Sequence, residues 1–132
     1  MTARVSAESV AGLERFAFGD SAALADALLA LVIAGRKTAT CWSAHHIGPS
    51  EPGERSVVLD GKGIPRAVIE TVEIRERHFA EVDAAFARDE GEGDLSLDFW
   101  RRAHRDYFER NGGFADDMRL WCERFRLVAL VD

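Results

Sequence analysis

The chain has 132 residues, of which 17 are basic and 23 acidic, so it carries a net charge of −6 at neutral pH. This length and the lack of any repeat or linker predict one domain over 1–132, and the acidic balance argues against broad contact with duplex DNA. No apolar run approaches the roughly 20 residues of a membrane helix. The first residues lack a signal-peptide core and the two cysteines form no C-x-x-C pair, so we expect a cytoplasmic protein.

The N-terminal part of the chain predicts two helices. A short helix is expected at 9–16. A longer one at 20–34 has Asp20 or Ser21 as its N-cap and leucines at the helical period. Gly35 suits the left-handed position that ends a helix.

A hairpin is predicted in the middle of the chain. Segments 57–59 and 64–74 have strand patterns, and the Asp-Gly-Lys-Gly stretch at 60–63 is a turn signal between them. Strict alternation would place two sets of residues on opposite faces of the second strand. These sets are Ile64, Val68, Val72 and Ile74 on one face and Ala67, Ile69 and Thr71 on the other.

Two helices and a strand are predicted in the C-terminal part. A short helix carrying the apolar residues of 79–86 stops at Gly91, and a longer one runs from Ser96 to the Asn-Gly-Gly stretch at 111–113. Segment 121–131 alternates as a strand with its odd-numbered apolar residues on one side. Strands in the middle and at the end, with helices between them, indicate an α+β domain around a mostly antiparallel sheet.

The octet Gly35-Arg36-Lys37-Thr38-Ala39-Thr40-Cys41-Trp42 holds the best candidate for a reactive pair. Lys37 and Thr40 follow the end of the long helix, where a turn would bring amine and hydroxyl within hydrogen-bond reach. Arg36 would add a positive charge beside the lysine. The structural alternatives are a solvated lysine that neutralises carbonyls at the helix end and an ordinary threonine at the start of a strand.

Three carboxylates away from this octet are further candidates. Glu70 lies inside an apolar strand, so it either faces solvent through alternation or lines a cleft. Glu92 and Asp94 belong to an acidic loop, where Asp94 would fix a turn. The other interpretation is that these loop carboxylates orient Lys37.

Two of the three tryptophans have different predicted environments. Trp42 has little reason to be buried and is the candidate for stacking on a base. Trp100 has apolar neighbours at helical spacing and is assigned to the core.

The histidines and cysteines give no metal-binding spacing. His45 and His46 are adjacent and would point to opposite sides of a strand, while His78 and His104 stand alone. Cys41 is interpreted as a buried, inert thiol. We therefore expect no metal and no cofactor from the residues themselves.

Four segments together resemble the ASCH family of the PUA-like superfamily, in its longer bacterial branch. They are Phe18-Gly19-Asp20, Gly35-Arg36-Lys37-Thr38-Ala39-Thr40, Glu90-Gly91-Glu92-Gly93-Asp94-Leu95-Ser96-Leu97 with Trp100, and Cys122-Glu123-Arg124-Phe125-Arg126-Leu127-Val128. The resemblance implies a compact β-barrel of mostly antiparallel strands with flanking helices. It also implies a cleft that accepts RNA or a modified nucleobase.

The resemblance further implies an amide-hydrolysing site. A smaller branch of the family hydrolyses N4-acetylcytidine with a Lys-x-x-Thr pair and a distant glutamate, which match Lys37, Thr40 and, by context, Glu90. Lys37 would be the base, Thr40 the nucleophile or the holder of a water, and Glu90 the proton shuttle. Trp42 stands where the family pattern has an arginine, so a stacking surface replaces an anion contact.

The expected function is hydrolysis of an N4-acylated cytosine nucleoside or a related modified base. Candidate substrate-binding residues are Arg36, Trp42, Glu70, Glu92 and Asp94. The alternatives are a single-strand endoribonuclease, which alone would need a divalent cation, and a non-catalytic reader of RNA or nucleotides. The expected partner is a small nucleoside or single-stranded RNA, with no duplex DNA and no membrane.

Overall fold

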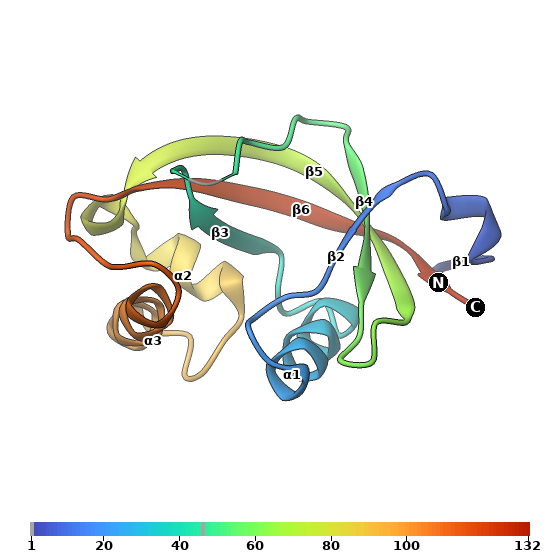
Figure 1. Cartoon of the computed structure of the whole chain (residues 1–132), viewed down its shortest axis with the longest axis horizontal. Coiled ribbons are helices and arrows are strands. Elements are labelled where there is room, and N and C mark those ends of the chain that lie inside the picture. Colours follow the sequence, from blue (N-terminus) through green and yellow to red (C-terminus); the bar gives the residue numbers. More distant parts are fainter. Residues whose placement is uncertain (1, 46) are drawn as a thin grey trace.

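The computed structural model describes residues 2–45 and 47–132. His46, which follows His45 in the sequence, lies outside the described residues. Its frame is a six-stranded mixed sheet with strand order β1-β6-β5-β4-β2, and β3 also pairs with β6 (Figure 1). The β1–β6 and β2–β4 pairs are parallel, and the others are antiparallel. The strands are β1 (Ala3–Val5), β2 (Glu14–Phe16), β3 (Ala39–Ser43), β4 (Arg55–Leu59), β5 (Pro65–His78) and β6 (Arg119–Val131).

The chain is therefore α+β, but the predicted barrel is not found. Among the described strands, β2 pairs only with β4 and β3 only with β6, so the sheet stays open. Residues of β2 and of β3 line one cavity between them. A cavity thus occupies the place where a further ladder would be needed to close a barrel.

Three helices lie on one side of the long β5–β6 ribbon, with α1 near one end and α2 and α3 near the other (Figure 1). They are α1 (Ala22–Ile33), α2 (Ala84–Glu90) and α3 (Leu97–Arg110), with short 3₁₀ turns η1 (Glu8–Val10) and η2 (Phe79–Glu81). No helix in the described part of the chain is long and apolar enough to cross a bilayer.

Local signals in the sequence fix the ends of these helices. The hydroxyl of Ser21 accepts from the Leu24 amide at 3.1 Å and that of Ser96 accepts from the Phe99 amide at 3.0 Å, as the predicted N-caps require. Gly91 ends α2 with φ +76°. The predicted helices at 20–34 and after Ser96 are thus confirmed.

The helix predicted at 9–16 is wrong. Only η1 is helical there, and β2 pairs in parallel with β4. Val10, Leu13 and Phe16 are spaced three apart, which mimics one face of a helix. Pairing with a strand some 40 residues away is a tertiary contact that overrides this local pattern.

The short helix predicted over 79–86 is divided into two. Residues of η2 begin it, but Val82 is extended, with ψ 128°. The Asp83 carboxylate then accepts from the Phe86 amide at 2.9 Å and starts α2. This restart sets the end of α2 at Glu90.

Bulges also change the predicted strand faces. One bulge leaves Val72 unpaired on β5 and 54% exposed, so it leaves the face predicted for it. A second, at Val128 of β6, moves Ala129 into a different core cluster from Phe125. The odd-numbered residues of β6 therefore do not share one face.

The buried hydrophobic residues form three clusters. One cluster lies under α2 and α3, one under α1, and one under the N-terminal segment around Val10. Because α1 and the α2–α3 pair pack on separate clusters, a space is left between them over β3. The candidate site lies in that space.

Candidate functional site

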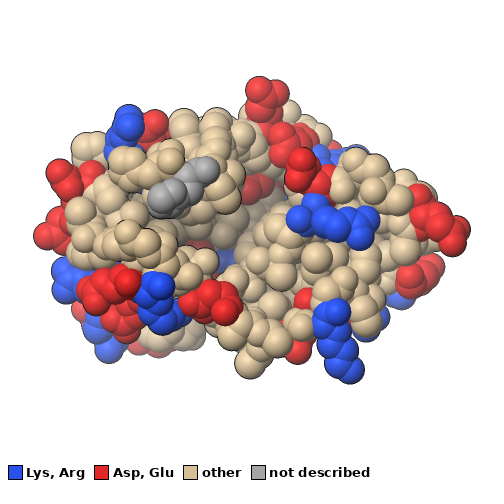
Figure 2. All heavy atoms as spheres, viewed as in Figure 1, with Lys and Arg blue, Asp and Glu red and all other residues tan. Residues whose placement is uncertain are grey.

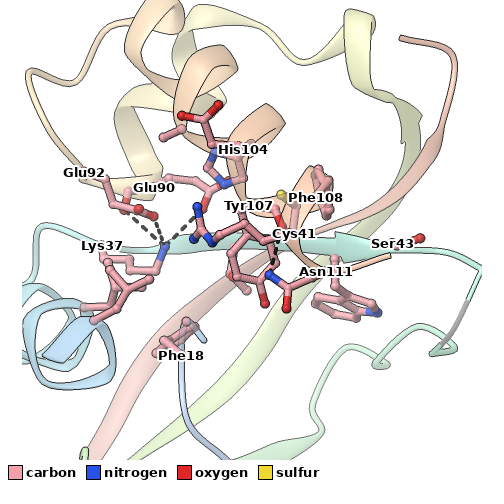
Figure 3. A pocket seen from close by; sticks show the side chains of 18 of the residues that line it. Phe18, Lys37, Cys41, Ser43, Glu90, Glu92, His104, Tyr107, Phe108 and Asn111 are labelled. Atoms are coloured by element: carbon pink, nitrogen blue, oxygen red, sulfur yellow. Dashed lines mark hydrogen bonds and ion pairs between the residues drawn. The ribbon is translucent and has the colours of Figure 1, made fainter. Parts of the chain in front are cut away.

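A cavity of about 550 Å³ opens between α1, α3 and β3. Figure 2 shows a hollow near the middle of this face, with charged atoms in its depth. Its wall is formed by Lys37, Glu90 and Glu92 on one side and by aromatic and polar residues of α3 on the other (Figure 3). Such a volume is typical of a small-molecule site.

Lys37 is directed into this cavity wall by the end of α1. Gly35 adopts φ +79°, and the amides of Arg36 and Lys37 both donate to the Leu31 carbonyl, at 2.9 and 3.1 Å. The chain therefore turns sharply, and only 1% of the Lys37 side chain is exposed. Lys37 therefore follows the turn at the end of α1, as predicted, but it is buried, so the alternative of a solvated lysine at the helix end is wrong.

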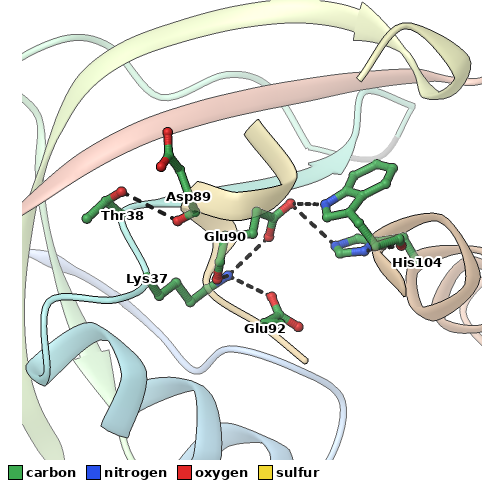
Figure 4. Close-up of polar contacts among 7 residues, drawn as sticks. Lys37, Thr38, Asp89, Glu90, Glu92 and His104 are labelled. Carbon is green, nitrogen blue, oxygen red and sulfur yellow. Dashed lines mark hydrogen bonds and ion pairs between the residues drawn. The ribbon is translucent and has the colours of Figure 1, made fainter. Parts of the chain in front are cut away.

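Two carboxylates and a carbonyl surround the buried ammonium. Lys37 Nζ donates to Glu90 Oε1 at 3.1 Å, to Glu92 Oε2 at 2.9 Å and to the Glu90 carbonyl at 3.3 Å (Figure 4). It also lies 5.3 Å from the centre of the Phe18 ring. The predicted orienting contact from the acidic loop is thus made by Glu92.

Glu90 connects Lys37 to α3. Its second oxygen, Oε2, accepts from the indole Nε1 of Trp100 at 2.6 Å and lies 3.4 Å from His104 Nε2 (Figure 4). Trp100 is buried, as predicted, and His104 stacks on its ring with centroids 4.2 Å apart. His104 is therefore part of the site, although the sequence shows it as an isolated histidine.

The ionisable groups of this network stabilise one another's charged forms. Burial alone would lower the pKa of Lys37, but the carboxylates of Glu90 and Glu92 outweigh it and raise that pKa. Burial would raise the pKa of Glu90, but Lys37 and His104 hold it well below its usual range. Burial would lower the pKa of His104, whereas Glu90 raises it. Lys37 is thus an ammonium at neutral pH, which opposes the predicted role of a free base.

Gly91 allows the two charged segments to meet. A Cβ at this residue would lie 2.6 Å from the Arg36 carbonyl oxygen and 3.0 Å from Lys37 Cα. The Thr38 amide also donates to the Asp89 carbonyl at 2.8 Å. The end of α2 is therefore held directly against the backbone of the lysine.

Thr40 and Trp42 line the same cavity from β3. Within the described residues the Thr40 hydroxyl makes no hydrogen bond to Lys37, because the ammonium is directed to the carboxylates. Trp42 is half-buried, and its indole nitrogen donates to the Gly48 carbonyl at 3.1 Å. This bond fixes the ring at the edge of the cavity, as a stacking surface requires.

A second lobe of about 680 Å³ continues the cavity towards β2 and β4. Its wall includes Glu123, which is opposite Thr40 in the β3–β6 register. Glu123 accepts from the Thr71 hydroxyl at 2.6 Å, and burial raises the pKa of its carboxyl. Glu123 belongs to the last of the four segments that resemble the family, but only the β3–β6 register places it opposite Thr40 at the cavity.

Three predicted substrate-binding residues lie away from the cavity. Arg36 is exposed, because it precedes the inward turn at Lys37. Glu70 pairs with Arg55 at 3.0 Å and Arg126 at 3.1 Å on the strands beside it, so the solvent-facing alternative is right. Asp94 accepts from the Ser96 amide at 2.9 Å and fixes the turn before α3. None of the three lines the cavity.

The far wall of the cavity is held by α3 and the start of α1. Tyr107 and Asn111 line it, and the Asn111 amide donates to Asp20 at 2.9 Å. Arg110 donates to the same carboxylate at 2.9 Å. These contacts join the C-terminal end of α3 to the residues before α1 and fix the width of the opening.

Metal-ligating atoms meet at one place in the described part of the chain. The sulfur of Cys41, a carboxylate oxygen of Glu90 and a ring nitrogen of His104 all lie within 4.8 Å of one another. Burial raises the pKa of the Cys41 thiol well above its usual value, so the sulfur is protonated at neutral pH. Cys41 is half-buried, and its inertness stays a prediction.

Comparison with known proteins identifies the family. The ASCH domain model matches residues 14–129, which is most of the chain. The chain belongs to the ASCH domain family. No curated protein matches it.

Solved ASCH structures share this fold. The ASCH domain from Lactobacillus crispatus JV V101 is 29% identical, with a TM-score of 0.83 over 94% of this chain and 86% of that one. Protein EF3133 from Enterococcus faecalis V583 is 32% identical, with a TM-score of 0.80 over 89% of this chain and 77% of that one. The ASCH protein from Zymomonas mobilis is 11% identical, with a TM-score of 0.60 over 89% and 68%, and supports the fold alone.

Proposed function

We propose that this ASCH domain is a hydrolase that cleaves the exocyclic amide of an N4-acylated cytosine nucleoside or a closely related modified base. The observation that carries the proposal is the buried Lys37 ammonium, fixed between Glu90 and Glu92 in a cavity that Thr40 also lines. These are the residues that match the Lys-x-x-Thr pair and distant glutamate of the hydrolysing branch.

The shape of the cavity supports a nucleoside. A volume of about 550 Å³ suits a ligand of that size. Trp42 and Tyr107 offer aromatic surfaces at its wall, and a stacked base gains about 1–3 kcal/mol from such a contact. The amide nitrogen of Asn111 donates to Asp20 and to the Tyr107 carbonyl, so its oxygen remains to accept from the polar edge of a base.

The protonation state of Lys37 defines its role in this proposal. In hydrolysis a water oxygen adds to the amide carbonyl, the C–N bond breaks, and Glu90 would carry the proton that the water loses to the departing nitrogen. To donate to the oxygen that becomes negative in this step, the ammonium would release the Glu90 carbonyl, the longest of its three contacts at 3.3 Å. To act as a base instead, Lys37 would first have to pass its proton to Glu90 or Glu92. Thr40 would hold the attacking water or attack by itself.

The distribution of basic residues disfavours a polymer of RNA. Lys37 is enclosed by carboxylates, Arg66 pairs with Asp60 at 2.8 Å, and Arg101 lines a separate hollow along α3. Sequence-independent binding of a nucleic acid strand needs a continuous basic surface. A small ligand in a narrow cavity is therefore favoured over the endoribonuclease and the RNA reader.

The test is incubation of the purified domain with N4-acetylcytidine while cytidine release is followed. We expect turnover that falls at least about 100-fold in Lys37→Met, since one lost oxyanion donor typically costs 10²–10³ in rate. Lys37→Arg keeps the charge but cannot act as a base, so partial activity would assign Lys37 an electrostatic role. Arg36→Met is the matched control and should keep full activity.

The alternatives have distinct outcomes in the same assay. Fragments from unstructured RNA that disappear with a chelator would replace the proposal by the endoribonuclease. Salt-sensitive binding of RNA without any product would replace it by the reader. No cytidine above the Lys37→Met background would remove this substrate.

A further inference from the structure

We propose that Cys41, Glu90 and His104 form a binding site for Zn²⁺ at the inner end of the cavity. The three side chains come from β3, α2 and α3, and their ligand atoms lie within 4.8 Å of one another. Thiolate, carboxylate and imidazole are the three kinds of ligand that zinc takes in proteins. All three residues line the cavity, so a fourth position would face its interior.

The spacing is close to that of a tetrahedral ion. With zinc about 2.3 Å from sulfur and about 2.0 Å from nitrogen and oxygen, neighbouring ligand atoms are roughly 3.3–3.6 Å apart. His104 Nε2 and Glu90 Oε2 are already 3.4 Å apart. The Cys41 sulfur lies no more than 4.8 Å from a carboxylate oxygen of Glu90 and a ring nitrogen of His104.

The surroundings of the ligands are those of a metal site. His104 Nδ1 lies 2.9 Å from the Trp100 carbonyl, so this nitrogen carries a proton and donates it. A histidine that binds a metal through one nitrogen usually donates the other to a carbonyl or carboxylate. Trp100 holds the carboxylate too, through its bond to Glu90 Oε2 at 2.6 Å. One tryptophan therefore orients both ligands.

A proton or a metal ion fits between His104 Nε2 and the Glu90 carboxylate. With the ring proton on Nδ1, a neutral His104 would direct a lone pair at Glu90 Oε2 from 3.4 Å. Either a second proton or a metal ion removes this repulsion. Lys37 does not compete for that position, because it bonds Oε1 instead.

The site is tested by metal binding alone, so its outcome is independent of hydrolysis. Metal-free protein is titrated with Co²⁺, which reports a thiolate ligand by a sulfur-to-cobalt charge-transfer band. We expect the band to saturate at one ion per chain and to disappear when Zn²⁺ is added. Cys41→Ser should abolish the band, and His104→Gln should weaken cobalt binding at least tenfold.

Cys122 provides the matched control, because it is directly opposite Cys41 in the β3–β6 ladder. Cys122→Ser should keep the band. Retention of the band in Cys41→Ser, its loss in Cys122→Ser, or no band at all in the native protein would overturn the site. Urea unfolding of each metal-free variant verifies that it is folded, and a rise in the unfolding midpoint on adding Zn²⁺ should occur in the native protein and not in Cys41→Ser.

Discussion

Replacing Lys37 by Met should destabilise the domain strongly. Its side chain is 1% exposed and that of Glu90 is 2% exposed, so the substitution leaves a carboxylate buried without its ammonium. Removing one partner of a buried ion pair costs about 3–5 kcal/mol. We expect the lower end, about 3 kcal/mol, because Trp100 and His104 still contact Glu90. That is a large part of a total stability of about 5–15 kcal/mol.

The measurement is urea unfolding with a chelator present, followed by tryptophan fluorescence. For a slope of about 2 kcal/mol per molar urea, the midpoint should fall by about 1.5 M. The double variant Lys37→Met/Glu90→Gln removes the unpaired charge as well and should recover at least half of the loss. A single variant as stable as the native protein, or a double variant less stable than the single one, would refute a buried ion pair at this site.

Three further outcomes are expected. Gly35→Ala and Gly91→Ala both place a side chain at a positive φ, which costs about 1–2 kcal/mol of stability. Only the new methyl of Gly91→Ala also meets the backbone next to Lys37, so this variant should lose about 1–3 kcal/mol more stability. Equal urea midpoints for the two variants would contradict this contact. Glu123→Gln should stabilise the domain at pH 7 and not at pH 4. Burial raises the pKa of the Glu123 carboxyl in the folded domain above its value of 4.5 in the unfolded chain. The contribution of the neutral carboxyl to folding stability is therefore complete below pH 4.5 and is lost as the pH rises through the folded pKa. Urea midpoints at the two pH values check this, and a variant that is less stable at pH 7 would argue against it. Trp42→Ala should weaken cytidine binding by about 5- to 150-fold in calorimetry if the indole stacks on the base, and unchanged affinity would place the base elsewhere.

Sequence patterns predicted the parts of the fold that depend on near neighbours. Ser21 and Ser96 cap helices through bonds to amides three residues away, and Gly35 turns the chain at the end of α1. Such contacts depend on a few consecutive side chains, so a single sequence contains them. The position of Lys37 just after α1 follows from the same local turn.

Patterns failed where pairing partners are distant. The segment around Phe16 has helical spacing but forms β2 because β4 offers a ladder. Val72 leaves its predicted face, and Ala129 lies in a different core cluster from Phe125, because a bulge depends on the register of two strands. Strict alternation along one strand contains no information about its neighbour.

The candidate site likewise has a local part that the sequence predicts and a part that depends on distant segments. The sequence by itself determined the Lys37–Thr40 spacing and the acidic loop that contains Glu92. The family resemblance also indicated Glu90, but only the tertiary structure decided that Trp100, His104 and Cys41 converge beside that lysine and that its ammonium is paired. The reason is physical: a buried charge acquires its pKa and its partners from whatever packs around it, and those groups come from separate helices and strands.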